Sequence, residues 1–123
     1  MAIDDKVTRR HIAHATWYDS IGVVNVSGYE SKDIDAVVCE SDALATGVIS
    51  RLLTLGYHIP EDIRVIGYDN IPIAQMYHPA VTTVAIPIDN MSIAAVNALV
   101  HLIGGKQVNS QSFIPTLIVR ETG

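Results

Sequence analysis

The chain has 123 residues, of which 49% are hydrophobic and 17% charged, a composition typical of one globular domain and not of a disordered segment. Its 8 Lys and Arg residues against 13 Asp and Glu residues give a formal charge of −5, which argues against a free-standing nucleic-acid binder. The single cysteine excludes an internal disulfide framework and is typical of a reducing compartment.

The N-terminal third contains two valine- or alanine-rich stretches separated by polar residues. Residues 11–17 are expected to form a strand, and residues 21–26 predict another strand from β propensity alone. His11 and His14 would lie on opposite faces of the first strand, so we expect no metal site there.

Neither a membrane span nor a signal peptide is expected. The longest apolar stretch, residues 93–103, is interrupted by Asn97 and His101 and is shorter than the ~20 residues that a span requires. Residues 1–10 hold no apolar run of the kind found in signal peptides. We therefore expect a soluble cytoplasmic protein.

The next segment predicts a buried strand followed by a helix. Residues 36–39 are short, continuous and rich in valine, as in a strand buried on both faces. Ser41 and Asp42 offer N-cap side chains for a helix that runs to about residue 55, and Gly56 stands just beyond its end. The apolar spacing predicts that the buried face of this helix consists of Leu44, Val48, Leu52 and Leu55.

The rest of the chain continues this alternation of strands and helices. The expected elements are a strand at 64–68, a short helical segment at 73–78, a strand at 81–85, a long helix from about 87 to 103 and an edge strand at 113–119. Strands that alternate with helices of this length predict an α/β fold with a mostly parallel sheet and flanking helices.

Three side chains fall at the carboxyl ends of expected strands: Trp17, Ser41 and Asp69. In open α/β sheets, ligands bind in the crevice beyond these ends. Asp69 can accept two hydrogen bonds, Ser41 can donate or accept one, and Trp17 offers a flat apolar face with an indole donor. The set suits a sugar, a nucleoside or a similar polar ring.

Polar and aromatic residues at the strand ends can also have a purely structural role. Asp42 is expected to cap its helix and not to bind a ligand, Asp69 could equally cap the segment that follows it, and Trp17 could pack in the core. No phosphate-binding loop or serine-nucleophile motif is present, and Cys39 is expected to be a buried hydrophobe. We therefore expect no enzyme activity, metal or cofactor, the alternative being a small doubly wound enzyme that uses Asp42 or Asp69 as acid or base.

A set of landmarks occurs in order along roughly the last ninety residues, namely Ser41-Asp42, Ala45, Gly47, Gly56, Pro60, the Val65–Asp69 block, Pro79, Thr82-Thr83-Val84, Pro87 and Met91. With these landmarks the chain resembles the effector-binding domain of the LacI/GalR family of bacterial transcription regulators. Residues 117–120 are similar to the closing strand of that family.

The resemblance implies an incomplete fold of the periplasmic binding protein type I kind. Residues 1–85 would form the C-terminal subdomain, residues 86–112 would pack on an N-terminal subdomain that is missing here, and residues 113–123 would hold the closing strand. No DNA-binding domain is expected in this chain. The resemblance also implies that residues 20–30 are a helix despite their valines.

The resemblance implies a function in effector binding and dimerisation for a regulator that meets DNA through a domain absent from this chain. Trp17, Ser41 and Asp69 match family positions that line the effector pocket, although the family usually has Asn where this chain has Ser41. The implied homodimer contacts are Leu44, Thr46, Ile49 and Tyr77, with core packing as the alternative for the two apolar helix residues. A sugar-binding component of a transport system is the alternative function in the same fold.

Overall fold

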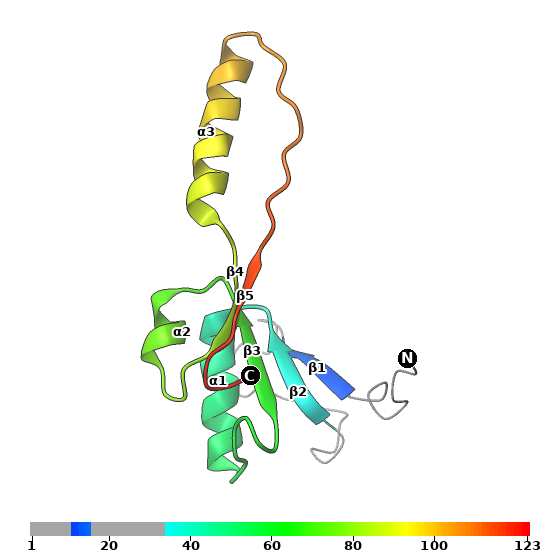
Figure 1. Ribbon diagram of the computed structural model, residues 1–123, viewed down its shortest axis with the longest axis vertical. Helices are drawn as coiled ribbons and strands as arrows, with labels where there is room; N and C mark the ends of the chain where they lie inside the picture. The colour runs from blue at the N-terminus through cyan, green and yellow to red at the C-terminus, as the bar shows by residue number, and fades with distance from the viewer. Residues whose placement is uncertain (1–10, 16–33) are drawn as a thin grey trace, which may run out of the picture.

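The computed structural model describes residues 11–15 and 34–123 and contains a five-stranded sheet with the order β1-β2-β3-β4-β5 (Figure 1). The strands are β1 (His11–Ala15), β2 (Ile34–Cys39), β3 (Arg64–Tyr68), β4 (Thr82–Ala85) and β5 (Thr116–Ile118). Strands β1 to β4 run parallel, and β5 pairs antiparallel with β4 at the edge. The expected α/β fold with a mostly parallel sheet is confirmed, and the edge strand is shorter than predicted.

In the part of the chain that the structure describes, three helices connect these strands: α1 (Asp42–Thr54) between β2 and β3, α2 (Pro72–Met76) between β3 and β4, and α3 (Ile88–Ile103) between β4 and β5. Helices α1 and α2 contact each other beside the sheet, and α1 also packs on β3. The helix expected at residues 20–30 lies outside the described residues.

Helix α1 begins and ends as its sequence predicts. Its last turn is closed by Gly56, which has a φ of +87°, a conformation open to glycine without a steric penalty. The amide of Gly56 donates to the carbonyl of Leu53, and the amide of Tyr57 donates to that of Leu52. This pair of bonds is a Schellman motif, which satisfies carbonyls that the helix end would otherwise leave free.

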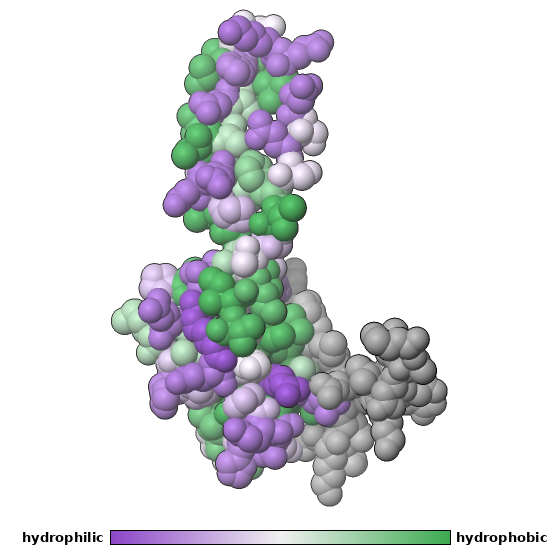
Figure 2. Space-filling model, in the orientation of Figure 1, coloured by the Kyte–Doolittle hydropathy of each residue, from purple (hydrophilic) through white to green (hydrophobic). Residues whose placement is uncertain are grey.

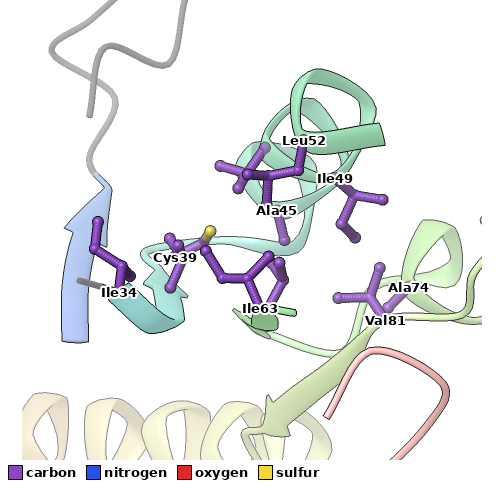
Figure 3. Packing of buried hydrophobic residues seen from close by; sticks show 11 residues of the cluster. Ile34, Cys39, Ala45, Ile49, Leu52, Ile63, Ala74 and Val81 are labelled. Carbon is purple, nitrogen blue, oxygen red and sulfur yellow. The ribbon is translucent and has the colours of Figure 1, made fainter. Parts of the chain in front are cut away.

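The buried face of α1 is rotated from the predicted one. Val48 and Leu52 are buried as expected, but Ala45 and Ile49 complete the face, whereas Leu55 is 54% exposed and Leu44 only partly buried. The α1 side chains pack over Cys39 of β2 and Ile63, and Ala74 of α2 and Val81 extend the same cluster (Figure 3).

Helix α3 projects away from the sheet, and the chain returns from it to β5 as an extended segment (Figure 1). We call residues 86–115 the projecting lobe. None of the α3 residues is buried, and Figure 2 shows apolar surface on the lobe. The exposed apolar side chains of α3 are Ile88, Met91, Ile93, Val96, Leu99, Val100, Leu102 and Ile103. Within residues 11–15 and 34–123, no helix is both long and apolar enough to cross a membrane.

Candidate functional site

The carboxyl edge of the parallel strands brings together two of the three predicted site residues. Ser41 follows β2 and Asp69 follows β3, and β2 and β3 are parallel neighbours, so both residues lie at the same edge of the sheet. Strand β4 also ends at this edge, and the chain leaves it toward α3. The projecting lobe therefore rises from the edge that carries Ser41 and Asp69.

Ser41 is the N-cap of α1, one of the two residues that the sequence offered for this role. The backbone of Ser41 is extended, with φ −151° and ψ 162°, and its Oγ accepts a hydrogen bond from the amide of Leu44 at 3.2 Å. The prediction that Asp42 caps the helix is wrong, because Asp42 lies in the first turn and its carboxylate binds groups outside α1. The Ser41 hydroxyl keeps its proton available as a donor.

The Asp42 side chain is fully buried and binds groups from two other elements. Its Oδ1 accepts from the hydroxyl of Thr83 in β4 at 2.5 Å, and its Oδ2 accepts from the amide of Ile71 at 2.8 Å. A Cβ at Gly67 of β3 would overlap this carboxylate, so the glycine leaves the space that the carboxylate fills. Hydrogen bonds to both oxygens offset the cost of burying the group.

Asp69 and Asn70 form a turn of unusual backbone geometry directly after β3. Their φ angles are 93° and 57°, in the left-handed region that Asp and Asn enter more readily than most residues. Asp69 is exposed. The alternative role of Asp69 as a helix cap does not hold, because the N-cap of α2 is Ile71 and α2 has no side-chain cap hydrogen bond.

The thiol of Cys39 lies beneath this edge and is not a reactive group. Burial and, to a lesser extent, the negative charge of Asp42 together raise the pKa of Cys39 to about 12. A thiol with this pKa carries almost no thiolate near neutral pH. The prediction that Cys39 behaves as a small buried hydrophobe is confirmed.

Several polar residues at this edge were missed by the sequence reasoning. Thr83 and Arg120 belong to the network around the turn, because the Nη2 of Arg120 donates to the Oδ1 of Asn70 at 2.7 Å and its Nη1 donates to the carbonyl of Val81 at 2.8 Å. The available signal was the pair Thr82-Thr83 inside a strand that otherwise reads as buried. Buried polar side chains need partners, so such a pair predicts a polar network.

Some predicted residues fall outside this description. Trp17 lies outside the described residues, and the side chains of His11 and His14 in β1 are likewise not described. Among the described residues, no group of three or more His, Cys, Asp or Glu side chains is placed to hold a metal ion.

The predicted dimer contacts on α1 and after α2 differ in how accessible they are. The prediction for Ile49 is wrong, because its side chain is 0% exposed and packs in the core of its own chain. Leu44 and Tyr77 are partly buried against that core, and Thr46 is partly exposed with its hydroxyl donating to the carbonyl of Ala43. Leu44, Thr46 and Tyr77 remain candidates.

A separate cavity of about 450 Å³ lies within the projecting lobe. It is lined by α3 residues that include Ile93, Asn97 and His101, and by Val108 and Phe113 of the returning segment. None of its lining residues belongs to the carboxyl edge of β2 or β3, so the cavity is distinct from the site at Ser41 and Asp69.

Comparison with known proteins agrees with this architecture. Residues 5–122 match the family model described as "periplasmic binding protein-like domain". The HTH-type transcriptional regulator MalR of Streptomyces coelicolor is 34% identical over 118 residues, which cover 94% of this chain and 34% of that regulator. The HTH-type transcriptional repressor PurR of Vibrio vulnificus is 43% identical over 89 residues, covering 71% of this chain and 27% of that repressor.

A solved structure supports the same relationship. A LacI family transcriptional regulator from Lactobacillus casei, crystallised with bound sucrose, has a TM-score of 0.65 and 34% identity, covering 74% of this chain and 34% of that one. The chain thus spans about a third of the length of the relatives that it matches.

Proposed function

Since the chain belongs to the LacI family, as a periplasmic binding protein-like effector-binding domain, we propose that it recognises a small polar effector for a longer transcriptional regulator. The effector class that we propose is a sugar or a similar polar metabolite. Binding would change the affinity of the regulator for DNA through a domain outside these residues. Such a regulator acts where the DNA is, so the proposal includes a cytoplasmic location.

The observation that carries the proposal is the placement of Ser41 and Asp69 at one edge of the parallel sheet. The exposed carboxylate of Asp69 can accept hydrogen bonds from two neighbouring hydroxyls, and the Ser41 hydroxyl retains a donor after capping α1. This is the chemistry of polyol recognition. Sucrose bound to the Lactobacillus casei relative supports the same ligand class, and Trp17 remains our proposal for an aromatic face of the pocket.

The domain division proposed for this chain follows the position of the lobe. Residues 1–85 would form one wall of the effector cleft, residues 86–112 would pack on a second subdomain, and residues 113–123 would return to the first. The exposed apolar side of α3 supports this division because such a surface is normally covered. An effector held between two subdomains would favour their closed arrangement over the open one by its differential affinity.

Homodimerisation is part of the proposal and would use the surface of α1 and the segment after α2. Leu44, Thr46 and Tyr77 are the contacts that we propose, since each retains some exposed surface. The effector would change the relation between the two copies, and with it the spacing of two DNA-binding parts. No chemical step is involved, and the named relatives are regulators.

The test uses the complete regulator that carries this chain. A thermal-shift screen of sugars and nucleosides, with sucrose included, identifies an effector, and calorimetric titration then measures its affinity. Asp69→Asn keeps a residue that tolerates the left-handed backbone but replaces one acceptor oxygen by a donor. We expect a loss of affinity of about tenfold or more, the worth of one hydrogen bond to a charged group.

The matched control is Asp35→Asn, the same substitution at an exposed position of β2, which should leave affinity unchanged. Equal effector affinity in the wild type and the Asp69 variant would contradict the site. A sugar-binding transport component is the second candidate, and an export signal encoded upstream of Met1 would favour it over the regulator.

A further inference from the structure

The turn formed by Asp69 and Asn70 needs an external support. Two successive non-glycine residues have positive φ angles, 93° and 57°, and each of them carries a conformational cost. An isolated turn would relax from this geometry, and the Asp69 carboxylate would then point elsewhere. The groups that bind the turn therefore decide where Asp69 presents its oxygens.

Three successive amides of the turn donate to fixed acceptors. The amide of Asp69 donates to the carbonyl of Val84 at 2.9 Å, and the amide of Asn70 donates to the Oγ1 of Thr83 at 3.3 Å. The amide of Ile71 donates to the Oδ2 of Asp42 at 2.8 Å. The first acceptor is sheet backbone, whereas the other two are side chains.

The two side-chain acceptors are themselves joined. The hydroxyl of Thr83 donates to the Oδ1 of Asp42, so its oxygen is oriented to accept from the amide of Asn70. Asp42 thus binds the turn once directly through Ile71 and once through Thr83. Both Asp42 and Thr83 are fully buried, and the carboxylate fills the space that Gly67 leaves open. Water cannot readily replace either contact.

The C-terminal segment also binds the turn. Arg120 donates from Nη2 to the side-chain oxygen of Asn70 and from Nη1 to the carbonyl of Val81, so its guanidinium connects the turn to the chain just before β4. The amide of Arg120 also donates to the hydroxyl oxygen of Thr82 at 2.8 Å. The turn is therefore bound both from α1 and from the residues after β5.

From this network we infer that Asp42 is a positioning residue for effector recognition. Through Thr83 and the amide of Ile71 it fixes the left-handed turn that presents Asp69, without touching the effector itself. The inference rests on the proposed function only for the role of Asp69 as an effector contact. The positioning of the turn by Asp42 stands on the described contacts alone.

The test is amide hydrogen exchange and carbon chemical shifts, measured by NMR on the whole 123-residue chain. Thr83→Val removes the hydroxyl at nearly constant volume, and Thr83→Ser keeps the hydroxyl but removes a methyl group. We expect Thr83→Val to accelerate exchange at Asn70 and Ile71 by about tenfold or more relative to a core amide, the factor equivalent to one net hydrogen bond. Thr83→Ser should restore the wild-type protection and the wild-type shifts of Asp69 and Asn70.

The core reference is the amide of Val65, a fully buried residue of β3, which donates to the carbonyl of the buried Thr122 at 2.9 Å. A loss of protection at Asn70 and Ile71 that only matches the loss at Val65, or a failure of Thr83→Ser to restore the turn, would overturn the inference. Asp42→Asn is a second variant with the same readout, since its amide group cannot accept from both Thr83 and Ile71.

The two proposals can fail separately. The exchange measurement needs no effector, so a negative result removes the positioning role of Asp42 and leaves the effector site standing. Unchanged effector affinity in Asp69→Asn removes the effector site and leaves the support of the turn standing.

Discussion

Replacement of Ile49 by alanine should be far more destabilising than replacement of Leu55, although both lie on or next to the same helix. Ile49 is 0% exposed, whereas Leu55 is 54% exposed at the end of α1. Truncation of a fully buried isoleucine leaves a cavity and costs about 3–4 kcal/mol. Leu55 is already about half exposed, so its truncation to alanine loses only about half of the transfer free energy of a buried leucine. The expected loss of stability is about 1 kcal/mol or less.

Urea unfolding followed by circular dichroism measures this difference. With a slope of about 1.5 kcal/mol per molar urea, Ile49→Ala should lower the unfolding midpoint by about 2 M and Leu55→Ala by well under 1 M. The measurement is repeated at two protein concentrations, because a residue at a subunit interface would give a loss that depends on concentration. Equal losses for both variants would refute the rotated helix face, and a concentration-dependent loss for Ile49 would return it to the interface.

Three further outcomes follow from the described contacts. In urea unfolding, Gly67→Ala should cost about 2 kcal/mol or more because its Cβ would overlap a buried carboxylate, whereas Gly47→Ala, in open space on α1, should stabilise by about 1 kcal/mol. The free energy of unfolding should fall as pH rises from 9.0 toward about 12, because the unfolded chain releases the Cys39 proton while the folded chain retains it; Cys39→Ala should remove that part of the slope. The isolated chain should self-associate through α3 in sedimentation velocity, and Val100→Glu should weaken this association more than the control Ser92→Glu.

Local signals in the sequence predicted the strands and helices well, because the hydrophobic pattern of each element and the residues that begin and end it lie close together in the chain. The valine-rich strands, Ser41 before α1 and Gly56 after it act within a few residues of the chain. The strand β2 and the helix α1 occur where hydrophobic periodicity and the capping residues predict them. The strand from 64 to 68 matches residue for residue.

Local sequence signals did not predict which face of α1 is buried. Leu44 and Leu55 satisfy the helical spacing as well as Ala45 and Ile49 do, so hydrophobicity alone did not separate the two faces. The choice depends on what the helix packs against, and Ala45 permits a closer approach than leucine would. Ile63, Ala74 and Val81 complete that packing from other elements.

The sequence predicted the residues proposed to contact the effector and missed the residues that support them. Ser41 and Asp69 could be found because they follow recognisable strands. Asp42 was misread as a cap because its partner Thr83 is 41 residues away along the chain, and sequence patterns of short range cannot show such a pairing. The positive φ at Asp69 likewise depends on that distant support.

The pairing of Ala85 with Thr116 has a consequence for how this domain is built. The chain leaves the sheet at one residue and returns at its cross-strand neighbour, so the projecting lobe is topologically an insertion into a β-hairpin. A two-residue turn could close that hairpin in its place, because adjacent antiparallel strands need no longer connection. The buried cluster contains no residue of the lobe. The sheet together with α1 and α2 therefore forms a module, and the segment inserted between β4 and β5 can vary without disturbing it.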